Sequence, residues 1–351
     1  MNSKKWILTT LSMSIILILV LSLLTYVIDP FYQYHYAEDG YPVNPRYAIP
    51  GLIKNYDYDS VLIGSSMTQN FDSQEFKDKL DLDILKVNLG GMNVPDIHLN
   101  MDLIQKTGKC KTMFIGIDLH KFAEDIPETH FPEYLYDGYW NDYKYLLSSD
   151  VYTRFLPLSL AVKGLEALGK PVPSMLASKS DIHTMGYWND DFKFGEKAVL
   201  NTIVKKTNQV STLNTQYMAN RLKYNIDEFY KKLDHETEYI MFFPPYSAFY
   251  WTNCENNGYL NVFFDAKKYF YELSQKHKNI QVYDFQNIDE TIDLSYYKDT
   301  THYSKDINSY MVDCFSTKKF LVESSETIEA NCIGITEKSN YIKEKYKDFI
   351  F

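Results

Sequence analysis

The sequence predicts an α/β protein with a parallel β-sheet in three layers, preceded by one transmembrane helix. Three observations predict this: short apolar runs recur along the chain, helical stretches separate them, and an uncharged apolar stretch runs from Trp6 to Ile28. A content of 45% hydrophobic and 23% charged residues is typical of a folded protein. A chain of 351 residues with this composition is long enough to bury a full core.

The expected strands are five runs of apolar and β-branched residues. They are apolar throughout rather than at alternate positions, which is typical of strands covered on both faces of a parallel sheet. The runs are Ser60–Ile63, Ile84–Leu89, Thr112–Ile117, Tyr239–Phe243 and Ile280–Phe285.

The stretches between these runs have helical signals. Pro95 suits a first helical position, and the helix predicted over Asp96–Lys106 ends toward Gly108. Two further helices are predicted from apolar residues spaced at helical intervals. The first stripe is Leu222, Ile226, Phe229 and Leu233, and the second is Val262, Ala266, Phe270 and Leu273. Strands that alternate with helices imply three layers and right-handed crossovers.

The N-terminal stretch predicts a membrane anchor. A helix from Trp6 to Ile28 would span about 33 Å, enough to cross a hydrocarbon core of about 30 Å. Lys4 and Lys5 precede it and Asp29 follows, so residues 1–5 are expected in the cytoplasm and everything after Asp29 outside. The alternative is a cleaved signal peptide, but the stretch exceeds the usual ~7–15 residues and no A-x-A-like site follows it.

The rest of the chain is expected to have three parts. Residues 29–59 form an extended lead-in without clear periodicity, residues 60–320 form the α/β domain, and residues 321–351 form a peripheral, polar extension. Within the domain, residues 120–210 are too long for a crossover in a compact sheet. We interpret them as an insertion packed over the edge or mouth of the sheet, either as a lid or as structural padding.

Charge and cysteine content narrow the possible functions. A net charge of −10 without a concentrated basic surface argues against a nucleic-acid binder. The 31 Tyr residues fit either a coding bias or sugar-stacking surfaces. Four cysteines follow the anchor: Cys110, Cys254, Cys314 and Cys332. They form up to two disulfides, with three possible pairings, or remain free thiols. Their spacing matches no zinc pattern, and no metal or organic cofactor is expected.

Small and polar residues follow the expected strands. In open parallel sheets, functional groups gather at the carboxyl ends of the strands. The first strand ends in Gly64-Ser65-Ser66, the second in Asn88-Leu89-Gly90-Gly91, and the third in Gly116-Ile117-Asp118. The segment Asp299-Thr300-Thr301-His302 follows the fifth strand.

These residues include the parts of a nucleophilic site. A hydroxyl nucleophile needs a base to take its proton and a carboxylate to orient that base. Asp299 and His302 are three residues apart, so on one helical turn they would share a face. Ser66, His302 and Asp299 are therefore the candidate catalytic triad.

The order of these motifs resembles the SGNH (GDSL-like) hydrolase family over roughly residues 60–320, with the insertion unmatched. The resemblance implies a three-layer, flavodoxin-like parallel sheet. It also implies that Ser66, rather than Ser65, is the nucleophile, because Ser66 takes the place of the serine in the family's G-D-S motif. The backbone N–H of Ser66, with that of Gly90 or Gly91, would form the oxyanion hole.

Two positions depart from the family pattern. Ser65 stands where the family has Asp, and Asp118 stands where it has the oxyanion-hole Asn. An ionised carboxylate cannot donate a hydrogen bond and would repel an oxyanion. Asp118 is therefore either protonated in a buried site or has another task.

The predicted membrane anchor narrows the resemblance to two groups of membrane-anchored proteins. One N-terminal helix followed by Asp29-Pro30-Phe31, with a G-S-S serine and a late D-x-x-H-Y, looks like teichoic-acid D-alanine transfer proteins and alginate-acetylation proteins. That likeness implies a serine acyltransferase or esterase for an envelope polysaccharide or teichoic-acid-like polymer, with a membrane-bound O-acyltransferase as partner. The alternative is a silent SGNH-fold protein that binds polymer or scaffolds an acylation machine. A phosphate-binding, flavodoxin-like receiver or nucleotide module is disfavoured, since the chain has no GxxxxGK[ST] loop.

Overall fold

The computed structural model describes residues 3–36, 40, 42–125, 128–138, 141–173, 175–176, 182–203 and 215–347. The chain forms two compact units. The anchor unit combines Met1–Asp57 with His130–Met185, and the sheet unit combines Tyr58–Thr129 with Gly186–Phe351. This division differs from the predicted boundaries, since the expected insertion is split between the units and the expected lead-in belongs to the anchor unit up to Asp57.

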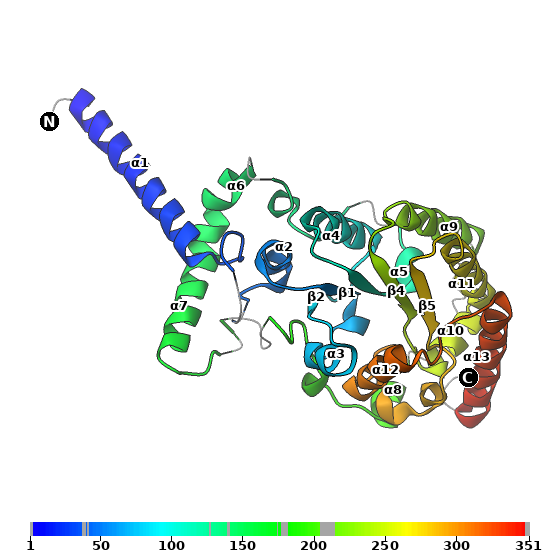
Figure 1. Ribbon diagram of the computed structural model, residues 1–351. Helices are drawn as coiled ribbons and strands as arrows, with labels where there is room; N and C mark the ends of the chain where they lie inside the picture. Colours follow the sequence, from blue (N-terminus) through cyan, green and yellow to red (C-terminus); the bar gives the residue numbers. More distant parts are fainter. Residues whose placement is uncertain are drawn as a thin grey trace. The chain divides into compact units, whose positions relative to one another are not determined.

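The sheet unit is built on five parallel strands in the order β2-β1-β3-β4-β5 (Figure 1). The strands are β1 (Ser60–Gly64), β2 (Ile84–Asn88), β3 (Thr112–Gly116), β4 (Glu238–Phe243) and β5 (Ile280–Asp284). All five predicted strands are confirmed to within one residue at each end. Their side chains are mostly buried on both faces, which is why each strand is a continuous apolar run.

Helices cover both faces of this sheet. Figure 1 shows α4 (Val94–Thr107), α9 (Thr215–Tyr230) and α11 (Leu260–Ser274) on one side, and α3 (Ser73–Leu80) and α12 (Lys305–Thr317) on the other. The unit also contains α5 (Leu119–Phe122), α8 (Glu196–Thr202), α10 (Ala248–Asn256) and α13 (Ser325–Lys345). Its short helices are η1 (Ser66–Thr68), η5 (Asn189–Asp191), η6 (Asp289–Ile292) and η7 (Leu294–Tyr296). The predicted parallel α/β architecture is confirmed.

Local signals account for the helix that follows β2. The Asn93 side chain accepts the Asp96 N–H, while the Asp96 carboxylate accepts the Asn93 N–H, so the two residues form a capping box. Gly108 ends the helix in the left-handed conformation, with φ of 64°. The predicted helix before β4 also forms, and Leu222, Ile226 and Phe229 are its buried stripe.

The C-terminal segment differs from the prediction of a peripheral extension. Helix α13 packs against α10 and α11. Its buried side chains include Ile328, Ile335 and Ile342. The helix looks polar in the sequence because its exposed faces hold most of the Lys and Glu residues, which outnumber the narrow buried stripe.

The anchor unit contains the helix predicted to cross a membrane. Helix α1 (Ser3–Ile28) is long and apolar enough to do so. The unit's other elements are α2 (Pro45–Asn55), η2 (Glu133–Leu135), α6 (Asp142–Leu146), the π-helical η4 (Val151–Phe155) and α7 (Leu156–Ala167).

The lead-in after α1 is folded, contrary to the expected extended segment. The Asp29 carboxylate accepts the backbone N–H groups of Gln33, Tyr34 and His35 and the Tyr145 hydroxyl. The fully buried Phe31 ring stacks on Tyr145. Asp29-Pro30-Phe31 is therefore a structural turn that joins α1 to residues more than a hundred positions later.

The four cysteines are free thiols rather than disulfides. Three are buried, and Cys110 is half-buried. Burial raises the pKa of Cys110 and Cys254 to about 12, so both stay protonated at neutral pH.

Candidate functional site

The first part of the site is the turn between β1 and η1. Ser65 is the N-cap of η1, and its side chain accepts the Met67 N–H at 3.3 Å. Ser66 is the first residue of η1, so its N–H has no acceptor within that short helix. β1 and β3 are neighbours in the sheet, at the point where the strand order reverses. Ligands of open α/β sheets bind at such switch points.

Ser66, His302 and Asp299 form a continuous hydrogen-bonded chain. The distance from Ser66 Oγ to His302 Nε2 is 2.8 Å, and that from His302 Nδ1 to Asp299 Oδ2 is also 2.8 Å. These contacts assign the ring's two nitrogens different partners: Nδ1 donates to the carboxylate and Nε2 accepts from the hydroxyl. The structure thus brings together the three residues expected from the sequence.

The contact between Asp299 and His302 does not come from a helical turn, so that prediction was wrong. The residues lie in a loop closed by the bridge between Tyr297 and Tyr303. One Asp299 oxygen accepts the backbone N–H groups of Thr301, at 2.9 Å, and of His302, at 2.8 Å. An Asp side chain that bonds to the backbone just ahead folds the chain back as tightly as a helix does.

The environment of Asp299 keeps its carboxyl ionised. Burial acts to raise its pKa, but the hydrogen bonds and charge of His302, together with the N–H of Thr301, hold that pKa well below its usual range. Lys298 Nζ adds an ion pair at 3.1 Å. The carboxylate is therefore charged at any physiological pH and can stabilise a protonated His302.

Two neighbouring elements hold this loop in place. The Thr300 carbonyl accepts both the N–H and the hydroxyl of Ser247, which follows β4. The Tyr303 hydroxyl donates to the Met67 carbonyl at 2.8 Å and so ties the histidine loop to the serine turn. Ser247 and Tyr303 position the site, and no sequence motif distinguishes them from other polar residues.

Asp118 lies at the carboxyl end of β3 with one oxygen unpaired. It is 5% exposed, and the Ser65 hydroxyl donates to its Oδ2. Its Oδ1 is buried and has no hydrogen-bond partner within the described part of the chain. The His120 ring is its nearest ion-pair partner there, with Nδ1 at 3.6 Å. Ser65 is therefore directed at Asp118 and not at His302.

The two glycines expected at the oxyanion hole lie in the turn after β2. The Met92 N–H donates to the Leu89 carbonyl at 3.0 Å, and Gly91, with φ of 76°, takes the position where a type II turn needs a residue without a side chain. Gly91 lines the same cavity as Ser66, whereas Gly90 is outside the set of residues that line it.

Trp188 is a site residue that the sequence analysis did not identify. Its indole N–H donates to the Ser66 carbonyl at 3.1 Å, and its ring meets the His302 ring edge-on at 5.5 Å. The Lys298 ammonium lies 5.1 Å from the ring centre. The aromatic segment around Trp188 was visible in the sequence, but nothing local linked it to Ser66.

These side chains surround one cavity of about 380 Å³ within the sheet unit. It is lined by Ser65, Ser66, Met67, Gly91, Asp118, His120, Lys121, Tyr250, Thr301 and His302. A hydroxyl nucleophile, its base and a second carboxylate therefore face one space. Within the described ranges, no cluster of His, Cys, Asp and Glu is arranged to hold a metal ion.

No protein-family model matches this chain, and no curated protein matches it. Its function is therefore inferred from the geometry and chemistry of the site.

Proposed function

We propose that this protein is a membrane-anchored serine acyltransferase or esterase that modifies a cell-envelope glycopolymer through an acyl-enzyme. The observation that carries the proposal is the hydrogen-bonded chain from Ser66 through His302 to Asp299. A nucleophile, a base and an orienting carboxylate in this order are the parts of a serine triad.

Membership of the SGNH superfamily is part of this proposal. It is supported by a serine after β1, glycines after β2, Gly-Ile-Asp after β3 and an Asp-x-x-His segment ahead of α12. The strand order β2-β1-β3-β4-β5 is the flavodoxin-like order that the resemblance implies.

In the first half-reaction, Ser66 Oγ attacks the carbonyl carbon of an acyl donor while its proton passes to His302 Nε2. The bond from Ser66 to the acyl carbon forms, the bond to the leaving group breaks, and His302 returns the proton to the leaving group. Asp299 stabilises the imidazolium that exists between these transfers. The N–H groups of Ser66 and Gly91 are the proposed donors to the developing oxyanion.

In the second half-reaction, a hydroxyl of the acceptor loses its proton to His302 and attacks the acyl carbon. The bond to Ser66 then breaks, and His302 returns the proton to Ser66 Oγ. A sugar hydroxyl as acceptor gives transfer, and water gives hydrolysis. We propose transfer, because Asp118 in the cavity disfavours the strong oxyanion stabilisation that attack by water requires.

The anchor supports an envelope substrate. Lys4 and Lys5 before the apolar part of α1 favour a cytoplasmic N-terminus, which would place the chain after Asp29, including the whole sheet unit, on the outer side of the membrane. An acyl donor must then be supplied at or across the membrane. A membrane-bound O-acyltransferase is the proposed partner, and the polymer is the acceptor.

The alternative function is a silent protein that binds polymer or scaffolds an acylation machine. The unpaired Asp118 oxygen favours this alternative, because an ionised carboxylate beside the oxyanion position would oppose catalysis.

Covalent labelling of the full-length protein in detergent tests the two functions. A fluorophosphonate should form one adduct, on Ser66, and the adduct should be absent from Ser66→Ala. Ser316→Ala, which changes an exposed serine of α12, is the matched control and should label normally. In cells, Ser66→Ala should abolish polymer acylation. Normal polymer acylation in the Ser66→Ala strain, together with no adduct on Ser66 of the unmodified protein, would favour the silent scaffold.

A further inference from the structure

Two exposed aromatic side chains mark the ends of the apolar part of α1. Trp6 is 56% exposed and Tyr26 is 46% exposed. They are separated by 20 positions, which is about 30 Å along a helix and matches the hydrocarbon thickness of a bilayer. Trp and Tyr gather at both membrane–water interfaces. Tyr26 therefore marks the interface that the C-terminal end of α1 reaches.

Residues 142–167 contact α1 on the membrane side of this mark. The Ser22 hydroxyl donates to the Leu146 carbonyl at 3.1 Å and lies 3.1 Å from the Tyr152 hydroxyl. Ser22 precedes Tyr26 by one helical turn, about 6 Å along the axis. The end of α6 and the start of η4 are thus about 6 Å below the interface if α1 spans the bilayer.

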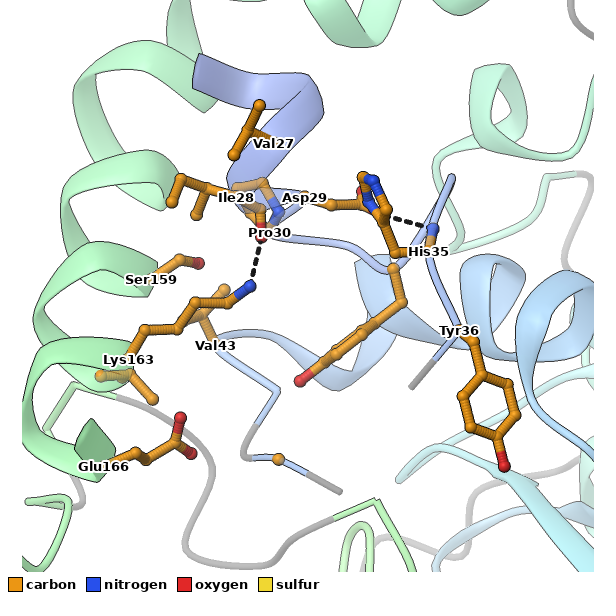
Figure 2. Close-up of a pocket in the computed structure, with 13 residues that line it drawn as sticks. Val27, Ile28, Asp29, Pro30, His35, Tyr36, Val43, Ser159, Lys163 and Glu166 are labelled. Atoms are coloured by element: carbon orange, nitrogen blue, oxygen red, sulfur yellow. Dashed lines mark hydrogen bonds and ion pairs between the residues drawn. The ribbon is translucent and has the colours of Figure 1, made fainter. Parts of the chain in front are cut away.

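Along α7, residues 142–167 return from this depth to the C-terminal end of α1. Lys163 Nζ donates to the Ile28 carbonyl at 2.8 Å, and Figure 2 shows this contact beside a cavity of the anchor unit. A lysine that caps the last carbonyl of a spanning helix sits at the headgroup level. Residues 142–167 therefore run from below the interface at Ser22 to the headgroups at Ile28.

Three of the exposed side chains of the segment are large and apolar or aromatic, and charged residues such as Lys144 and Asp150 are exposed among them. Tyr143 is 57% exposed, Leu147 is 51% exposed and Leu160 is 45% exposed. In water these side chains would form an unfavourable apolar surface beside the already apolar α1. At the depth fixed by Ser22, the same surface would face lipid.

The charges of residues 142–167 cancel. Three acidic residues, Asp142, Asp150 and Glu166, balance three basic ones, Lys144, Arg154 and Lys163. Attraction to anionic headgroups, which needs a basic excess, therefore contributes little to this contact. Burial of apolar area would supply the free energy.

We propose that residues 142–167 form a second membrane contact, which dips into the leaflet that receives the C-terminal end of α1 and is held there by burial of Tyr143, Leu147 and Leu160. The proposed partner is bilayer lipid, whether or not its headgroups carry a net charge. This contact would fix the cavity in Figure 2, lined by Val27, Ile28 and Lys163, at headgroup depth.

The test uses the full-length protein in vesicles of neutral phosphatidylcholine. A cysteine introduced by Leu147→Cys carries an NBD fluorophore, in a Cys110→Ser background because Cys110 is only half-buried. The matched control is Tyr224→Cys, at an exposed position on α9 of the sheet unit. The unsubstituted background measures labelling of the three buried thiols, and circular dichroism confirms that each variant folds.

The label at position 147 should emit at shorter wavelength than the label at position 224 and should be quenched by lipids brominated on the upper acyl chain. Neither effect should change with salt. Emission at position 147 equal to that at position 224 would show a water-exposed surface and overturn the proposal. A blue shift without quenching by brominated lipid would instead place a second protein copy on this surface and overturn it equally.

Discussion

Two adjacent serines at the end of β1 have different partners. Ser66 Oγ lies 2.8 Å from the base His302, whereas the Ser65 hydroxyl donates to the buried Asp118. Ser65 also caps η1, so it fixes the turn that aims its neighbour. At the residue scale, Ser66 is placed beside the base and Ser65 donates a hydrogen bond to one oxygen of the buried Asp118 carboxylate.

Asp118→Asn should raise hydrolysis of small esters by the proposed enzyme. The amide removes a charge that repels an oxyanion and supplies a donor in its place. One oxyanion donor contributes roughly 10²–10³-fold in rate, which sets the largest gain expected. Hydrolysis of p-nitrophenyl acetate by the full-length protein measures it, with Asp118→Asn/Ser66→Ala as the control for background. An unchanged or slower rate in Asp118→Asn would show that the carboxylate is needed as it stands.

Trp188→Phe tests the indole contact with Ser66. The substitution keeps an aromatic ring beside His302 but removes the N–H that donates to the Ser66 carbonyl. A neutral hydrogen bond contributes about 1 kcal/mol, so kcat for small esters should fall roughly fivefold while KM changes little. Exposed Phe192→Leu is the neighbouring control. A rise in KM alone would assign Trp188 to substrate binding instead.

His98 should make the sheet unit less stable in mild acid. Burial, aided by Lys232, lowers the pKa of His98 to about 4, whereas the unfolded chain titrates near its ordinary value of 6.5. Between these values the unfolded state binds more protons, so the unfolding free energy decreases as pH falls from 6.5 to 4. The loss should reach roughly 2–3 kcal/mol at the lower end of this range.

His98→Gln should flatten this pH dependence, because glutamine does not titrate. Urea unfolding between about pH 7 and about pH 4.5 measures it. Tyr224→Phe, at an exposed position on α9, changes neither a histidine nor a carboxylate and should retain the slope of the unmodified protein. Equal slopes in the His98→Gln and unmodified proteins would mean that His98 titrates normally in the fold.

At the scale of elements, the carboxyl ends of β1 and β3 both lie against one side chain, that of Thr68. A Cβ added at Gly64 or at Gly116 would come within 2.7 Å of Thr68 Cγ2 in η1. Both strands end in glycine so that η1 can lie directly over them. This close approach places Ser66 at the switch point.

Gly116→Ala should therefore destabilise the sheet unit by about 1–3 kcal/mol through overpacking. Thr68→Ser removes Cγ2 but keeps the hydroxyl, which donates to the Ser65 carbonyl at 2.9 Å. The double variant Gly116→Ala/Thr68→Ser should thus be more stable than Gly116→Ala alone. Thermal unfolding of the unmodified protein, both single variants and the double variant gives the coupling energy. Strict additivity would mean that another atom, such as Phe242 Cζ at 3.4 Å, limits the space.

The two helices predicted from apolar stripes were recovered with different accuracy. In the helix before β4, Leu222, Ile226 and Phe229 form the buried face of α9 as predicted, whereas Leu233 lies beyond the end of the helix at Tyr230. The stripe predicted in α11 was displaced: Phe263 and Phe264 are buried there, whereas Val262 is only half-buried. Packing of α11 against α9, α10 and α13 buries a wider face than one stripe describes.

At the scale of the whole molecule, the charges around α1 predict topology. A reporter that is active only in the cytoplasm, fused after Phe351, should be silent, because Lys4 and Lys5 are expected to keep the N-terminus inside. The same reporter fused before Met1 should be active and serves as the control. Mild washing should leave the protein in the membrane fraction. An active C-terminal fusion would exclude an envelope polymer as substrate.

The sequence by itself determined the strands, most of the helices around them and the residues of the candidate site. Strands buried on both faces must be continuously apolar, and parallel strands bring their carboxyl ends to one edge of the sheet. Those two rules located Ser65, Ser66, Gly90, Gly91 and Asp118 at strand ends, and the resemblance to the SGNH family then selected Ser66 as the nucleophile. Both rules act on short runs of neighbouring residues, so their effects can be recognised in the sequence of a single chain.

Only the tertiary structure decided the rest. It closed the Asp299–His302 contact with a loop rather than a helix, brought Trp188 to Ser66, buried one face of α13 and joined residues 130–185 to the anchor. Each of these results depends on partners far apart in the chain, as Phe31 and Tyr145 are. Such contacts leave no local period, because the free energy of packing depends on the surfaces that meet and not on the distance between them in sequence.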